Sequence, residues 1–436
     1  MLDTQGKSRN LANIFRQVIL WIGALGLGII LFALFNPTKA NAANHHNLPP
    51  LFTHNKNVLQ NGHKFTMKGV NAGGLFETEK YMSNVPNKNG WRELLNNYGT
   101  KAADTWNRNY WSDADFKNIK DMGFNTIRLP FTYMNLINYS KYNNNPNNPD
   151  LNAVWKPNAF RNLDRFISKA NSYGLYVVLD LHGAFGSQNG QEHSGQVIDN
   201  GEGQGLYGNR VNENLTDQLW AKIANHYRNW TGIAGYDLLN EPNTQKYTGT
   251  STTHRTGPEQ WNYYNRLFKT IRFRDPHHIV IMESCWDPVN LPNPAHPTNN
   301  FLGRWANKNV VYEFHEYPDS TAISDNAEAA WWDNIVENIK DANYNVPVYM
   351  GEFSLTENKG YTPGANQWSH TLNLFNHSGF SWTVWNYRTK ASSGNWGIFH
   401  EDSQDISPTS PDFGKPKNVV PNNNIYEAIE QAAKSH

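Results

Sequence analysis

Eight short apolar runs, spread between residues 65 and 388, constrain the fold of this chain more than any other feature. Short runs of this kind, rich in β-branched residues, are typical of buried β-strands. In chain order they are FTMKGVNAGG (from residue 65), FNTIRLP (124), LYVVLDLHG (175), GYDLLNEPN (235), HIVIMESC (278), NVVYEFHEY (309), PVYMGEFS (347) and GFSWTVWNYR (379). The chain is therefore expected to contain eight core strands.

Stretches with helical periodicity lie between most of these runs. In SDADFKNIKDMG, Ser112 can cap the first turn of a helix and Gly123 can end it. Five further helices are predicted over residues 158–174, 212–230, 258–275, 328–343 and 367–379. Eight strands alternating with helices predict an α/β fold, a (β/α)8 TIM barrel. A doubly wound open sheet is the alternative, because periodicity does not show whether a sheet closes.

The first 42 residues resemble an export signal. Lys7, Arg9 and Arg16 precede an apolar run over residues 18–35, and Ala40-Asn41-Ala42 follows as a small-residue cleavage pattern. We expect a signal peptide over 1–42, cleaved after Ala42, and a secreted, extracellular protein. The run is also long enough to span a bilayer, so an uncleaved anchor at the outer face of the cell membrane is the alternative. Residues 43–57 are predicted to be an Asn-rich linker and residues 58–436 a single barrel domain.

Composition limits the classes of partner. Lysines plus arginines equal aspartates plus glutamates at 38 each, so there is no basic footprint for nucleic acid and a neutral partner is expected. With 16 Trp and 21 Tyr in a chain of mean hydropathy −0.70, some rings are expected to line a wet cleft, where sugar faces are one use for them. The only cysteine, Cys285, can form no intramolecular disulfide and is expected to be buried. A monomer is expected.

Polar and aromatic side chains gather where the predicted strands end. In a (β/α)8 barrel the carboxyl ends of the strands carry the chemistry. The alternation of strand residues places Val348, Met350 and Glu352 on one face, which supports a common direction for such side chains. The residues at these ends are Arg128, His182, Asn240, Glu241, Glu283, His315, Tyr317, Glu352 and Trp385. They are expected to converge at the barrel mouth.

Two of these residues, Glu241 and Glu352, end the fourth and seventh predicted strands and would face each other across the mouth. Two carboxylates roughly 5 to 5.5 Å apart are what glycoside hydrolysis with retention requires, one as acid/base and one as nucleophile. The acid must be protonated and the nucleophile ionised, so their surroundings must push the two pKa values apart. Arg128 beside Glu352 would hold the nucleophile anionic, and Tyr317 could donate a hydrogen bond to the same carboxylate.

The other residues at the strand ends suit supporting roles. His315 could orient Glu241. Asn240 suits a hydrogen bond to the sugar 2-hydroxyl, and His182 could bind another hydroxyl of the same ring. Trp385 offers an aromatic floor for the apolar face of the sugar.

At these residues the chain resembles glycoside hydrolase family 5, of the clan A barrels, over nearly all of residues 58–400. The family pattern is a strand-two Arg, a strand-three His, Asn-Glu-Pro, His-x-Tyr, Gly-Glu and a late Trp. Here it reads Arg128, His182, Asn240-Glu241-Pro242, His315-Glu316-Tyr317, Gly351-Glu352 and Trp385. The resemblance implies a (β/α)8 catalytic domain, with Glu241 as acid/base and Glu352 as nucleophile.

Two further segments, DLHGAFGSQNGQEHSG and GVNAGGLFETEKYM, are most similar to the β-glucan branch of that family. This branch contains fungal-type exo-β-1,3-glucosidases and related bacterial enzymes. In it a Glu after the first strand helps to bind the terminal sugar, and Glu79 stands at the matching place. The resemblance therefore implies a β-glucan polysaccharide or oligosaccharide as the substrate.

Histidine pairs, glycine-rich segments and two further glutamates carry weaker signals. The pairs His45-His46 and His277-His278 have no third and fourth ligand at a metal spacing, so neither a metal nor another cofactor is expected. The glycine-rich segments at 186–196 and 201–208 are not followed by GK[ST], which favours a sugar-binding loop over a phosphate site. Glu283 could bind substrate or only form a salt bridge, and Glu313 is expected to be a structural polar group in the barrel core.

The sequence thus predicts an exported, metal-independent retaining β-glycosidase of β-glucans, leaning to a glucan exo-1,3-β-glucosidase that acts through two glutamates. An endo-β-1,4-glucanase (cellulase) or a β-mannanase of the same family is the first alternative. A carbohydrate-binding surface protein that has lost catalysis is the second, although both carboxylates and their supporting residues are present.

Overall fold

The computed structural model describes residues 48–85, 88–143, 150–198, 205–242, 258–284, 308–355 and 360–435. The predicted signal segment, His45-His46 and Cys285 lie outside these residues. Within these ranges no helix has both the length and the apolar character needed to cross a bilayer.

Eight parallel strands form a closed barrel, in the order β10-β11-β4-β5-β6-β7-β8-β9. The ring closes where Trp382 on the last strand pairs with Lys68 on the first. The strands are β4 (Lys68–Asn71), β5 (Thr126–Thr132), β6 (Tyr176–Gly183), β7 (Ile233–Asp237), β8 (Ile279–Glu283), β9 (Val310–Glu316), β10 (Val348–Phe353) and β11 (Ser381–Val384). Each of the eight apolar runs supplies one strand, so the predicted (β/α)8 barrel is confirmed and the open sheet is wrong.

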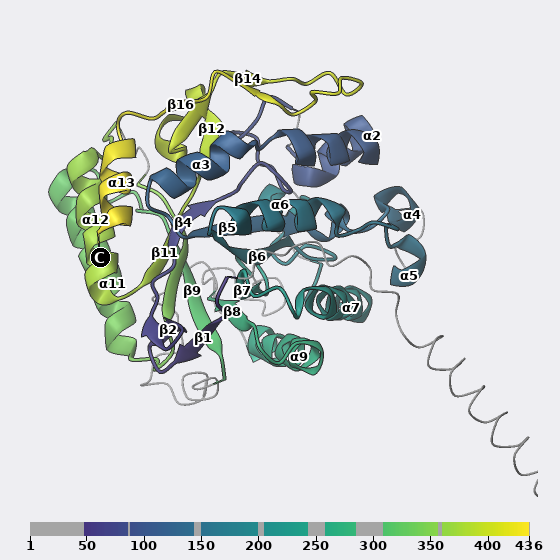
Figure 1. Cartoon of the computed structure of the whole chain (residues 1–436), viewed down its shortest axis with the longest axis horizontal. Coiled ribbons are helices and arrows are strands. Elements are labelled where there is room, and N and C mark those ends of the chain that lie inside the picture. Colours follow the sequence, from purple (N-terminus) through teal and green to yellow (C-terminus); the bar gives the residue numbers. More distant parts are fainter. Residues whose placement is uncertain are drawn as a thin grey trace, which may run out of the picture. The chain divides into compact units, whose positions relative to one another are not determined.

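Helices flank the barrel strands (Figure 1). Six of them were predicted: α3 (Asp113–Asp121), α6 (Arg161–Ser172), α7 (Arg210–Tyr227), α9 (Pro258–Arg274), α11 (Asp325–Ala342) and α12 (Ala365–Ser378). Ser112 caps α3 in a capping box with Asp115, and Gly123 follows the helix at φ +88°. Sequence periodicity missed α2 (Gly90–Asn109), α4 (Tyr139–Asn143), α5 (Leu151–Val154) and α13 (Tyr426–Lys434).

A small antiparallel sheet precedes the barrel and consists of β1 (Leu51–His54), β2 (Asn57–Gln60) and β3 (His63–Lys64). The predicted linker boundary at residue 57 is therefore wrong, because β1 begins at Leu51. The turn between β1 and β2 holds Asn55 at φ +52°, a conformation that asparagine tolerates well. Leu51 and Val58 pack with barrel residues such as Val178, so the sheet shares the barrel's core.

Short strands and 3-10 turns complete the fold after the barrel and in its loops. They are β12 (Arg388–Lys390), β13 (Phe399–Glu401), β14 (Ser403–Gln404), β15 (Pro416–Lys417), β16 (Val420–Pro421), η1 (Tyr133–Asn135), η2 (Glu192–Ser194) and η6 (Ala391–Trp396). Two of these turns carry residues of the cavity described below.

The barrel interior changes from apolar to charged along its axis. Tyr176, Val178 and Tyr349 belong to a buried apolar cluster shared with the small sheet. Two residues further along β6, Asp180 points to the same side of the strand as Val178 and is also buried. On β10, a Cβ at position 351 would lie 1.5 Å from the Glu313 carboxylate, so only Gly351 leaves room for this charged layer.

Candidate active site

Arg128, which is fully buried on β5, organises the charged layer. Its guanidinium nitrogens lie 3.2 Å from Asp180, 2.7 Å from Asp237, 3.0 Å from Glu313 and 2.6 Å from Glu352. Burial alone would lower the pKa of Arg128, but the surrounding carboxylates raise that pKa well above its usual value. The guanidinium is therefore a permanent positive charge, and Glu313 is the structural core group that the sequence predicted.

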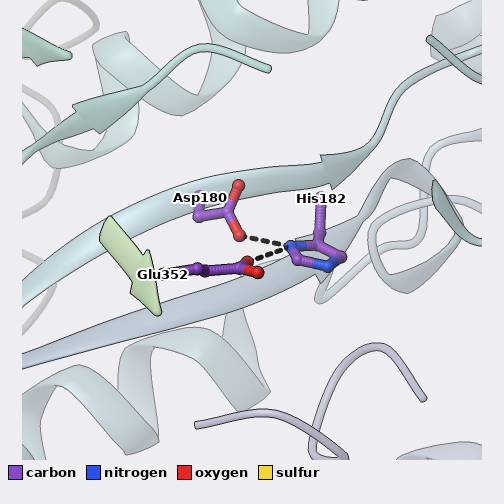
Figure 2. A group of neighbouring side chains, drawn as sticks. All are labelled: Asp180, His182 and Glu352. Carbon is purple, nitrogen blue, oxygen red and sulfur yellow. Dashed lines mark hydrogen bonds and ion pairs between the residues drawn. The ribbon is translucent and has the colours of Figure 1, made fainter. Parts of the chain in front are cut away.

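Glu352, at the end of β10, has both carboxylate oxygens held in place. Its Oε1 accepts a hydrogen bond from Arg128 Nη1, and its Oε2 accepts one of 3.1 Å from the Tyr317 hydroxyl. The structure contains both of these predicted contacts. His182 Nδ1 lies 3.9 Å from the same Oε1, and Figure 2 shows this nitrogen facing the carboxylates of both Asp180 and Glu352. A carboxylate fixed by a permanent cation is suited to act as an anionic nucleophile.

His182 is oriented from two sides. Its Nδ1 lies 2.6 Å from Asp180 Oδ2, and its ring stacks on Trp385 at 5.5 Å between ring centroids and 5° between planes. Burial lowers the pKa of His182 well below its usual value, so the imidazole is neutral. A neutral imidazole that donates from Nδ1 keeps Nε2 as an acceptor for a hydroxyl hydrogen.

Glu241 follows β7 in a left-handed conformation, with φ +42°. Side chains from two other elements hold its peptide groups: Glu283 Oε2 accepts from the Glu241 N–H at 2.6 Å, and Asn189 Nδ2 donates to the Glu241 carbonyl at 3.1 Å. Because this backbone conformation is unfavourable for a residue with a Cβ, these bonds fix the direction of the Glu241 side chain.

Two histidines contact the Glu241 carboxylate. His315 Nδ1 lies 3.1 Å from Oε1, as predicted for the orienting histidine, and His193 Nε2 lies 3.0 Å from Oε2. Burial would raise the pKa of Glu241, but His193 first and then His315 lower that pKa well below its usual value. The direction of this pKa shift is therefore opposite to the raised pKa that sequence reasoning predicted for the acid.

His315 Nδ1 lies 3.1 Å from Glu241 and 3.5 Å from Glu352, and one carboxylate oxygen of each glutamate lies within 4.8 Å of the other. Both residues line a cavity of about 160 Å³ at the carboxyl ends of the strands. The described residues that line it are Glu79, Tyr81, His182, His193, Glu241, Tyr317, Glu352, Trp385 and Trp396. Its volume lies below the roughly 300 to 1,000 Å³ of sites for drug-sized ligands, which suits a single sugar ring.

Two further predicted residues, Asn240 and Glu283, are fully buried and are not among the residues that line the cavity. Asn240 Oδ1 accepts a bond of 2.9 Å from Arg128, and within the described part of the chain its buried Nδ2 has no partner. Glu283 accepts the Glu241 N–H and lies 3.4 Å from His315 Nδ1, which favours the salt-bridge interpretation over direct substrate binding.

Glu79 lines the cavity, as the resemblance implied for the terminal sugar, and it accepts a hydrogen bond of 3.1 Å from Tyr81. Burial, which outweighs the opposing effect of His193, raises the pKa of Glu79 to about 8. At neutral pH the carboxyl group is therefore protonated and can donate as well as accept a hydrogen bond.

Sequence reasoning missed Tyr81, His193 and Trp396. Tyr81 stands two residues after Glu79, and His193 lies in the glycine-rich segment already expected to bind sugar, so both had a local signal. Trp396 ends η6, beyond the last barrel strand, and its ring lies 5.3 Å from Tyr81 and 5.5 Å from Tyr317. Nothing in its sequence neighbourhood distinguishes Trp396 from the other tryptophans.

Three loops, which follow β4, β6 and β11, are tied together on one side of the cavity. Lys80 lies 3.9 Å from Glu192, and the Ser393 hydroxyl donates to the Tyr81 carbonyl at 2.7 Å. The Lys390 ammonium group donates to the Lys80 carbonyl at 3.2 Å. We refer to these contacts as the rim. The contacts made by Ser393 and Lys390 connect segments that are 312 and 310 residues apart in the sequence.

Two groups of side chains, Asp180-His182-Glu352 and Glu241-His315-Glu352, have the spacing of metal ligands. Glu352 belongs to both and is already paired with the guanidinium of Arg128. A metal ion at either place would therefore face this fixed positive charge at close range, which disfavours metal binding.

Comparison with known proteins is consistent with this geometry. A family model described as Cellulase (glycosyl hydrolase family 5) matches residues 84–391. A β-xylosidase of Phanerodontia chrysosporium is 29% identical over 60% of this chain and 50% of its own length. A probable glucan endo-1,6-β-glucosidase B of Aspergillus flavus is 26% identical over 76% of this chain and 86% of its own length.

A probable glucan 1,3-β-glucosidase A of Aspergillus niger is 25% identical over 58% of this chain, and the match covers 55% of its length. The chain thus spans about half of two of these three relatives. Among solved structures, the catalytic domain of the Thermobifida fusca endoglucanase Cel5A aligns with a TM-score of 0.53 at 17% identity, over 89% of this chain and 98% of that one. At this identity the likeness supports the barrel fold alone.

Proposed function

Because the chain belongs to glycosyl hydrolase family 5, whose model matches residues 84–391, we propose that it is a retaining β-glycosidase that releases glucose from the ends of β-1,3-glucan chains. The observation that carries the proposal is the close approach of Glu241 and Glu352, since one carboxylate oxygen of each lies within 4.8 Å of the other. Inverting enzymes separate their two carboxyl groups by roughly 6.5 to 9.5 Å to admit a water molecule, whereas retaining enzymes need roughly 5 to 5.5 Å.

In the first step Glu352 attacks the anomeric carbon and Glu241 protonates the departing glycosidic oxygen. The C1–O bond to the leaving sugar breaks, and an ester bond forms between C1 and Glu352. Arg128 and Tyr317 hold the attacking carboxylate toward the cavity. In the second step Glu241 accepts a proton from water, the resulting hydroxide attacks C1, and Glu352 leaves as a carboxylate.

Three side chains are suited to bind the reacting sugar. Asn240 Nδ2, which has no partner among the described residues, is suited to donate to the 2-hydroxyl, a bond that strengthens in the transition state. His182 offers Nε2 as an acceptor beside the ring, and Trp385, stacked on His182, supplies an aromatic surface. Together they favour a single pyranose ring at the reacting position.

Action on chain ends is supported by the rim and by Glu79. The rim joins the loops after β4, β6 and β11 on one side of the cavity, where an open cleft would leave them apart. Relatives named as glucan 1,3-β-glucosidases favour the β-1,3 linkage.

Incubation with laminarin, cello-oligosaccharides, mixed-linkage glucan and mannan, followed by product sizing, tests the proposal. Glucose should be the first product from laminarin, and an early ladder of oligosaccharides would contradict exo action.

Replacing Glu79 by alanine should lower kcat/KM on short β-1,3-oligosaccharides roughly 5- to 150-fold, because a buried sugar hydroxyl left without its partner costs about 1 to 3 kcal/mol. A loss of similar size is expected on laminarin, because an enzyme that acts on chain ends places a terminal sugar beside Glu79 in every productive complex. Initial rates on laminaritriose and on laminarin measure both losses. The exposed Glu337 on α11 provides a matched control, and Glu337→Ala should leave both rates unchanged. Unchanged kcat/KM on laminaritriose in Glu79→Ala would remove Glu79 from terminal-sugar binding.

We further propose that the chain is exported and that residues 1–42 are removed, as the small-residue pattern before Ala43 suggests. Expression of the full chain in a secreting host should give a soluble product that starts at Ala43. Mass spectrometry of the intact secreted protein measures this start. Recovery of the intact chain from Met1 in the membrane fraction would instead support an uncleaved anchor.

A further inference from the structure

His193 is a cavity residue that the two reaction steps above do not use. It belongs to η2 in the loop after β6, and its Nε2 lies 3.0 Å from Oε2 of Glu241, with only 16% and 10% of the two side chains exposed. His315 Nδ1 contacts the other oxygen, Oε1, at 3.1 Å. Each carboxylate oxygen of Glu241 therefore faces one imidazole nitrogen.

Asn189 determines which hydrogen-bonding role His193 can take. Its Oδ1 accepts from the N–H of Gln191 at 2.9 Å, and its Nδ2 donates to the Glu241 carbonyl at 3.1 Å. These two bonds fix the amide orientation and leave Nδ2 only 2.7 Å from His193 Nε2. An imidazole nitrogen carries either one hydrogen or one lone pair. Asn189 favours Nε2 as an acceptor, whereas the Glu241 carboxylate favours it as a donor.

Asn189 favours Nε2 without a hydrogen and Glu241 favours Nε2 with one. His193 Nε2 and Glu241 Oε2 therefore share a single proton. Burial would lower the pKa of His193, but the Glu241 carboxylate, followed by Glu79 and Glu352, raises that pKa to about 9. The titratable groups that face His193 are Glu77, Glu79, His182, Glu241 and Glu352. The pair therefore keeps its single proton throughout the neutral range.

We propose that His193 stores the proton that Glu241 delivers to the leaving oxygen and takes it back when Glu241 activates water. The inference rests on the proposed function, since it assigns Glu241 as the acid/base. His193 is thus a positioning residue that acts through Glu241.

In the first step the N–H bond of His193 Nε2 breaks and an O–H bond forms at Glu241 Oε2. This hydrogen turns toward the glycosidic oxygen by rotation about the Cδ–Oε2 bond and is transferred as C1–O breaks and the ester to Glu352 forms. His193 is then neutral, and its lone pair can accept from Asn189. In the second step water gives a proton to Glu241, which returns it to His193, while hydroxide replaces Glu352 at C1.

The variant His193→Gln tests this role, because glutamine can donate a hydrogen bond but cannot carry the proton. On laminaribiose, which has a poor leaving group, wild-type kcat/KM should fall only as the pH rises through about 9. In the variant Glu241 keeps only His315 as an imidazole partner, so the fall should move to lower pH by more than one unit, with a loss of roughly tenfold or more at pH 8. On 2,4-dinitrophenyl β-glucoside, whose leaving group needs no acid, kcat/KM should change less than about threefold.

His370, paired with Asp333 at 3.1 Å on the surface, gives the matched control, and His370→Gln should leave both pH profiles unchanged. If His193→Gln keeps the wild-type alkaline limb on laminaribiose, His193 carries no catalytic proton and the proposal is overturned. A loss of equal size on both substrates at every pH would also overturn it, because that pattern indicates a packing or binding role.

A second measurement, the NMR titration of His193, does not depend on enzyme activity. In a chain with ¹⁵N-labelled histidine, the NMR titration midpoint of His193 should fall by more than one unit when Glu241 is replaced by glutamine. An unchanged midpoint would refute proton sharing. Absence of glycosidase activity on all the glucans in the wild type would refute the proposed function, while the titration would still decide whether the two groups share a proton.

Discussion

Replacing Glu352 by alanine is expected to lower kcat on laminari-oligosaccharides by on the order of 10⁴-fold or more, because no ester to the sugar can form without this carboxylate. The cavity gained in place of the side chain should admit a small anion. With azide or formate present, turnover of an activated aryl β-glucoside should return and give a product of inverted anomeric configuration. Kinetics with and without azide, with NMR assignment of the product, measure both effects.

The fold should survive this substitution, since Arg128 keeps Asp180, Asp237 and Glu313 as partners. Circular dichroism and the thermal midpoint of the variant provide the check, with Glu337→Ala again as the surface control. Ordinary turnover by a folded Glu352→Ala protein would show that the nucleophile lies elsewhere.

Replacing Glu241 by alanine should produce a different pattern, with a loss of roughly 10² to 10⁴-fold on laminaribiose and a small loss of kcat/KM on 2,4-dinitrophenyl β-glucoside. Only the first substrate needs its leaving oxygen protonated. Azide added to the variant should give a product of retained configuration, since Glu352 still forms the ester and azide replaces water in the second step. Rates on the two substrates and the configuration of the azide product are the measurements.

Equal losses on the two substrates would mean that Glu241 binds or organises rather than transfers a proton. Glu241→Gln separates these roles further, because the amide preserves the side-chain volume next to His315 and removes the exchangeable carboxyl proton.

The contacts made by Glu352 could be predicted from sequence because they depend on strand order and alternation alone. Once the eight strands are assigned, Arg128 on β5 and Tyr317 after β9 must point into the same mouth as Glu352. Neighbouring strands of a parallel barrel have regular spacing, so residue types at strand ends become neighbours in space.

The electrostatics of Glu241 could not be predicted in this way. His193 reaches Oε2 from a loop, and loop conformation is not fixed by periodicity. The same limit applies to Trp396 in the loop after β11, and to β1, whose four residues lie in a segment rich in asparagine that composition assigns to a linker. Tertiary packing decides each of these cases.

The four carboxylates around Arg128 also set a limit on the stability of the protein. Burial raises the pKa of Asp180 and of Asp237 well above the usual value. A carboxyl group with a raised folded-state pKa contributes stability that is present below its unfolded pKa and is lost as the pH rises through the folded pKa. Asp180 and Asp237 therefore lower the free energy of unfolding at the pH where the reaction needs an ionised Glu352.

Where these carboxyl groups are ionised, their negative charge complements the positive charge that develops on the sugar carbon in the transition state. Activity and thermal stability thus oppose each other at this centre. Neutralising the acids would raise the thermal stability and lower the activity. Heat-resistant forms of this barrel should arise from changes distant from Arg128, in the outer helices or in the small sheet that packs with the apolar end of the barrel.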